Sequence, residues 1–66
     1  MRVAAEIEVE RGDDMVLVPL NGRFEHYGSY NPQERGLSLE SWDSNGFLLT
    51  PSESEYAISA LYEAAQ

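Results

Sequence analysis

The chain has 66 residues, no cysteine, and twelve acidic against four basic side chains, which gives a net charge of −8. A chain this short forms a single domain, residues 1–66, with one small core and no disulfide or thiolate zinc site to stabilise it. The negative charge argues against direct binding to nucleic acid or to an anionic membrane, so we expect any charged partner surface to be basic.

The N-terminal segment predicts a strand over residues 2–10. Alternate positions from Val3 to Val9 are apolar, and Glu6 and Glu8 lie between them. A period of two over this length is typical of a strand with one buried face.

Residues 11–14, Arg-Gly-Asp-Asp, supply turn residues before a second strand over 15–20. The run from Met15 to Leu20 is apolar throughout, which favours a strand covered on both faces. We expect these two strands to form a hairpin.

Asn21-Gly22 between apolar flanks predicts a second hairpin turn, because a type I′ turn needs positive φ at both central positions. The next strand would then span 23–27. A two-residue loop would pair Leu20 with Arg23 and Pro19 with Phe24.

Residues 28–36 contain glycine, serine and proline without apolar periodicity, so we expect the longest loop there. Alternation resumes over 37–42 and predicts another strand. Residues 43–46, Asp-Ser-Asn-Gly, predict a further hairpin turn into a short strand over 47–49.

Thr50-Pro51-Ser52-Glu53 predicts the start of a helix over residues 51–65. The threonine hydroxyl caps the helix, proline is suited to the first helical position, and glutamate at the third completes a capping box. From Ile58 to Ala65 apolar residues recur at helical spacing, which indicates a stripe that packs on the sheet.

The fold class is therefore α+β: a small antiparallel β-meander of four to five strands with one C-terminal α-helix packed on one face. One helix covers one face of a sheet. The other face must be charged, paired with a second copy, or bound to a partner.

Five carboxylates near the N-terminus are the first candidate partner-binding residues, and they are Glu6, Glu8, Glu10, Asp13 and Asp14. Alternate strand residues lie about 6.6 Å apart, so the glutamates would form a regular row that imitates a nucleic-acid backbone toward basic side chains. The alternative is that the row only keeps the protein soluble and prevents edge-to-edge pairing of strands.

Tyr30 and Arg35, in the predicted long loop, complete the candidate binding residues, because exposed aromatic and arginine side chains often anchor interfaces. Trp42 is interpreted as part of the core, since the chain has few large apolar residues.

No residue is assigned a catalytic, metal or cofactor role, and we expect a protein that is not an enzyme. His26 is the one histidine, and a minimal enzyme would have to use it with a carboxylate such as Glu25. Residues 11–13 have the sequence Arg-Gly-Asp of a known integrin-binding motif, but three residues match easily by chance, and we interpret them as a hairpin turn. Residues 43–46 resemble part of a calcium loop only superficially, because aligning Gly46 with the glycine of that loop places Ser41 first and Ser52 last, where Asp and Glu are required.

The leading hypothesis is a small acidic protein-binding module that inhibits a nucleic-acid-handling enzyme or complex by mimicking DNA or RNA. Anti-restriction and anti-CRISPR proteins of phages and mobile elements share this general character. The alternative is a structural accessory protein or homodimer whose acidic surface serves solubility. The first residues turn acidic too early for a signal peptide, so we expect a cytoplasmic location, in the host if a phage encodes the chain.

Overall fold

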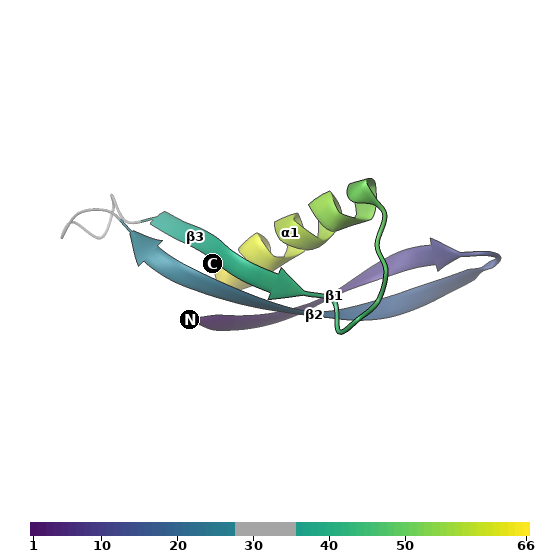
Figure 1. Cartoon of the computed structure of the whole chain (residues 1–66), viewed down its shortest axis with the longest axis horizontal. Coiled ribbons are helices and arrows are strands. Elements are labelled where there is room, and N and C mark those ends of the chain that lie inside the picture. The colour runs from purple at the N-terminus through teal and green to yellow at the C-terminus, as the bar shows by residue number, and fades with distance from the viewer. Residues whose placement is uncertain (28–35) are drawn as a thin grey trace.

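The computed structural model describes residues 1–27 and 36–66. Three strands form one antiparallel sheet in the order β1-β2-β3, and helix α1 packs across one face of it (Figure 1). The elements are β1 (Arg2–Arg11), β2 (Asp14–Tyr27), β3 (Gly36–Asp43) and α1 (Pro51–Ala65). The α+β class with an antiparallel sheet and a C-terminal helix is confirmed, whereas the described residues hold three strands instead of four to five.

A two-residue turn at Gly12 and Asp13 joins β1 to β2, and Arg11 pairs with Asp14 across it. Gly12 has a φ of +64°, in the left-handed region that suits glycine. The register places Ile7 opposite Val18, so the alternating apolar residues of β1 face the same side as those of β2. This is the hairpin predicted from the sequence.

The predicted hairpin turn at Asn21-Gly22 is wrong, because β2 runs through both residues as one strand of 14 residues. Gly22 pairs with Val3 on one side and with Trp42 on the other. A Cβ atom at Gly22 would lie 3.1 Å from Cδ2 of Leu61 in the helix. The glycine therefore serves close approach of the helix to the sheet, which is the other common reason for glycine within a strand.

Consequently the predicted pairing around that turn is also wrong: Leu20 pairs with Ala5, and Pro19 pairs with Glu6. β3 pairs with β2 only from Asn21 to Tyr27, so Pro19 lies beyond the end of the second ladder. Its carbonyl points to that open side and accepts a hydrogen bond from Nδ2 of Asn45 at 3.0 Å. The N–H that proline lacks would point the same way, so no β1–β2 hydrogen bond is lost.

The chain turns after β3, but the predicted strand over 47–49 does not form. Asn45 and Gly46 have φ values of 56° and 83°, and the amide of Phe47 donates to the carbonyl of Ser44 at 3.1 Å. Residues 47–50 then leave the sheet and cross to the start of α1 (Figure 1). Phe47 and Leu49 pack partly against the core, and this packing takes the place of strand pairing.

The predicted loop over 28–36 lies outside the described residues, except for Gly36, which begins β3.

Helix α1 begins where its capping signal predicts. The hydroxyl of Thr50 accepts from the amide of Glu53 at 3.2 Å, and the Glu53 carboxylate accepts from the amide of Thr50 at 3.0 Å. Farther along, the Tyr62 ring meets Phe24 edge to face at 5.0 Å between ring centroids, and its hydroxyl accepts from the amide of Leu39 at 3.1 Å.

Seven apolar side chains are buried between the helix and the sheet, and none of the buried side chains in the described residues is polar. They come from β1, β2 and α1, and they are Ile7, Val9, Val18, Leu20, Phe24, Ala57 and Leu61. All the strand members share the face that α1 covers.

The contact between Gly22 and Leu61 predicts that Gly22→Val lowers the free energy of unfolding by about 1–3 kcal/mol, since overpacking a close contact forces neighbouring side chains to move. Urea unfolding followed by circular dichroism measures this. Ser41→Val is the matched control on the exposed face of β3, where we expect a change within about 0.5 kcal/mol. Equal stability of Gly22→Val and the wild type would contradict the proposed packing role.

Candidate functional site

The sheet face opposite α1 is the candidate site, and we call it the outer face. Because side chains alternate along a strand, the residues between the core positions point to it. From β1 and β2 these are Arg2, Ala4, Glu6, Glu8, Glu10, Met15, Leu17, Pro19, Asn21, Arg23 and Glu25, and all of them are exposed. Figure 1 shows no element of the described chain over this face.

Glu6, Glu8 and Glu10 form a row of exposed carboxylates along β1. β1 is an edge strand, since the sheet order is β1-β2-β3. A row of this kind, at a spacing of about 6.6 Å, presents acceptors at regular intervals to basic side chains of a partner. The structure thus places three of the predicted binding residues side by side.

A row of exposed apolar side chains on β2 lies directly beside the glutamates, which pair in register with Met15, Leu17 and Pro19. Met15 is 58% exposed and Leu17 is 60% exposed. The prediction that this strand is covered on both faces is therefore wrong, because the one helix covers only the side of Val16, Val18 and Leu20. An unbroken apolar run in the sequence contains no signal that distinguishes these two cases.

The two aspartates of the turn are exposed but do not extend the glutamate row. Asp13 lies in the turn itself, and Asp14 is paired with Arg11 on the side of the sheet that faces the helix. The two remaining predicted binding residues, Tyr30 and Arg35, lie outside the described residues.

Arg11 links the end of β1 to the start of α1. Its guanidinium forms two hydrogen bonds with the Glu53 carboxylate, from Nη1 to Oε2 and from Nη2 to Oε1, each at 2.7 Å. Nη2 also donates to the carbonyl of Leu48 at 2.7 Å, and the guanidinium carbon lies 5.1 Å from the centroid of the Phe47 ring. Arg11 therefore connects β1 to the helix and to the loop that precedes it, and the Glu53 carboxylate neutralises its charge.

The hydrogen bonds from Arg11, followed by the backbone bond from Thr50, lower the pKa of Glu53 from 4.5 to about 2. The same carboxylate completes the capping box, so one side chain serves both the cap and the ion pair. Charge-assisted bonds of this bidentate kind are the stronger form of surface ion pair.

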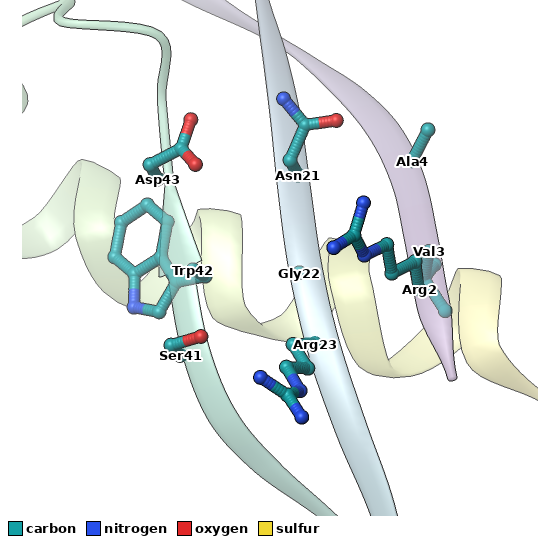
Figure 2. A pocket seen from close by; sticks show the side chains of 9 residues that line it. All are labelled: Arg2, Val3, Ala4, Asn21, Gly22, Arg23, Ser41, Trp42 and Asp43. Atoms are coloured by element: carbon teal, nitrogen blue, oxygen red, sulfur yellow. The ribbon is translucent and has the colours of Figure 1, made fainter.

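At the other end of the outer face, a hollow of about 590 Å³ crosses all three strands (Figure 2). Arg2 pairs with Arg23, which in turn pairs with Ser41, and two residues along the strands Asn21 pairs with Asp43. β3 has one extra residue here, Glu40, because the register shifts between Arg23 and Phe24. Sequence reasoning missed this cluster, because 20 residues separate Arg2 from Arg23 and only the strand register brings them together.

His26 is exposed near the end of β2, and no described side chain forms a hydrogen bond with its ring. Within residues 1–27 and 36–66, no group of three or more His, Asp or Glu side chains is placed to hold a metal ion. No helix of this part of the chain is long and apolar enough to cross a membrane.

No protein-family model matches the sequence, and comparisons with curated proteins and with solved structures give no match.

The lowered pKa of Glu53 predicts a loss of stability in acid. Because the pKa is lower in the folded than in the unfolded chain, ionised Glu53 stabilises the fold above pH 4.5, and this stabilisation disappears as the pH falls toward about 2. Urea unfolding at a series of pH values should show a weaker pH dependence in this range for Glu53→Gln than for the wild type.

Glu55→Gln is the matched control, since it removes a carboxylate from the same helix without touching the Arg11 bonds. It should retain the slope of the wild type between these pH values. An unaltered slope in Glu53→Gln would show that the ion pair does not contribute to acid sensitivity.

Proposed function

We propose that this chain is a non-catalytic protein-binding module whose outer face docks on a basic surface of another protein. The observation that carries the proposal is the pairing in register of the glutamate row with the exposed apolar row of Met15, Leu17 and Pro19. A surface that served solubility alone would have no need of large apolar side chains at about 60% exposure.

The two rows supply complementary parts of an interface. Leu17 and Met15 offer the apolar contact area that is buried at the centre of protein–protein interfaces, whereas Glu6, Glu8 and Glu10 offer acceptors for lysine and arginine. Acidic rows also raise the rate of association with a basic partner, because opposite charges steer the encounter. The partner would therefore be a protein with a basic surface.

A basic surface of sufficient extent is most common where a protein holds nucleic acid, so we further propose that the module inhibits a nucleic-acid-handling enzyme or complex. The glutamate row would occupy the groove in place of the phosphates, and blocking of this kind needs no catalytic residue. The net charge of −8 supports this reading, since it disfavours contact with nucleic acid itself. Inhibitors of restriction or CRISPR systems, encoded by phages or mobile elements, would be of this type.

The first test is the double variant Glu6→Arg/Glu8→Arg in pull-downs from lysate at ~50 mM and ~500 mM salt, because salt screens exposed charges within roughly 10 Å at ~0.1 M. We expect the wild type to retain a basic, nucleic-acid-binding protein at low salt and the variant to lose it. Circular dichroism should be the same for both, since the two side chains are exposed.

Glu55→Arg/Glu63→Arg is the matched control, with the same change in net charge on the exposed side of α1. It should retain the partner. If both double variants lose the partner equally, total charge and not the outer face determines binding, and the proposal fails.

The exposed apolar row also favours a second candidate, a homodimer in which two outer faces pack together. β2 is paired on both edges from Asn21 to Arg23, and its residues from Asp14 to Leu20 pair with β1 alone. The exposed apolar side chains lie on the outer face, so a dimer that buries them would pack two faces together. Sedimentation equilibrium over a range of concentrations should then show a dimer that Leu17→Ser converts to monomer. A monomer at all concentrations would exclude this candidate and leave the partner-binding proposal in place.

A further inference from the structure

The direct pairing of Arg2 with Arg23 is the least expected charge arrangement on the outer face. The two arginines are exposed cross-strand neighbours of β1 and β2, and like charges directly opposite each other destabilise a sheet. Only four basic side chains occur in a chain of net charge −8, yet two of them meet here. Among the described residues, the ion pair of Arg11 with Glu53 is the only one, so neither Arg2 nor Arg23 is neutralised by them.

Asp43 and Asn21, two other polar side chains of the hollow, each form a hydrogen bond with Asn45 in the turn after β3. Oδ1 of Asp43 accepts from the amide of Asn45 at 3.0 Å, and Nδ2 of Asn21 donates to Oδ1 of Asn45 at 3.3 Å. The hydroxyl of Ser41, opposite Arg23, forms no hydrogen bond with a described residue. Two guanidinium groups and the Ser41 hydroxyl can therefore donate hydrogen bonds to a ligand, and their two positive charges exceed the one negative charge of Asp43 in the lining.

The hollow has room for an anionic group together with part of the molecule that carries it. Gly22 lies between the two arginines and Ser41 and contributes backbone, because its Cβ direction is toward Leu61 on the helix side, and the volume is about 590 Å³. Figure 2 shows both guanidinium groups extending from their strands toward the β3 side, with the Trp42 indole beside β3 and no side chain rising from Gly22. The sheet backbone thus forms a floor that leaves space between the donors.

We propose that this hollow binds an oxyanion, a phosphate or carboxylate group, through the guanidinium groups of Arg2 and Arg23 and the hydroxyl of Ser41. An oxyanion would turn a repulsive pair into two charge-assisted interactions, and the guanidinium fork matches the geometry of phosphate and carboxylate oxygens. The site is independent of the acidic row, because it takes a ligand of opposite charge at the other end of the outer face.

The anion has two chemical sources, a phosphate-bearing small molecule or a carboxylate such as an acidic side chain. Backbone amide chemical shifts of the full chain should be followed by NMR during titration with sodium phosphate and, separately, with sodium acetate, each against sodium chloride at the same ionic strength. We expect saturable shifts at Arg2, Arg23 and Ser41, with a dissociation constant on the order of 1 mM because the donors are exposed. Tighter binding of phosphate identifies the first source, and tighter binding of acetate identifies the second.

Arg2→Gln/Arg23→Gln should weaken binding of the preferred anion at least about tenfold. Ser59→Glu/Ala64→Glu, which lowers the net charge equally on the exposed side of α1, should weaken it much less. No saturable shift with either anion, or equal weakening by both double variants, would overturn the proposal. Neither result bears on the acidic row, whose test uses different residues and a different partner.

Discussion

The structure depends on one constraint: a single helix covers a three-stranded sheet, and it can cover only one face. Burial of Leu61 against the strand position of Gly22, where a Cβ atom would make a tight contact at 3.1 Å, brings α1 close enough to enclose a small apolar core. Because a chain of this size has little apolar area to bury, that contact is central to its stability. The same constraint leaves the outer face exposed, with the side chains available for binding.

The pair of Arg11 and Glu53 orients the helix over that core. Glu53 caps the helix and also holds an arginine at the end of β1, so the helix start is tied to the hairpin on which the acidic row lies. The ion pair uses one of the four positive side chains of the chain, so the Arg11 guanidinium binds Glu53 instead of a carboxylate of β1. The row of Glu6, Glu8 and Glu10 is thereby left without a described counter-ion.

The outer face consequently has two ends of opposite character. A negative and apolar end lies on the hairpin, and a positive hollow lies where all three strands run together (Figure 2). A partner that is basic in one region and carries an anionic group in another would match both ends and would bind in one orientation only. Complementarity of this kind contributes more to specificity than to affinity.

The sequence by itself determined the local structure. The alternation from Val3 to Val9 and the capping residues Thr50 to Glu53 act over a few residues, so the first strand, its turn and the helix could be predicted from them. The sequence could not show whether Asn21-Gly22 forms a turn, since the same dipeptide fits a hairpin turn or a strand position that a helix approaches closely. The contact of Leu61 with the Gly22 position decided between these two structures. The exposure of Leu17 and the meeting of Arg2 with Arg23 depend on where the helix lies and on strand register. Tertiary structure alone decided these two features, because each depends on how segments that are far apart in the chain are placed relative to one another.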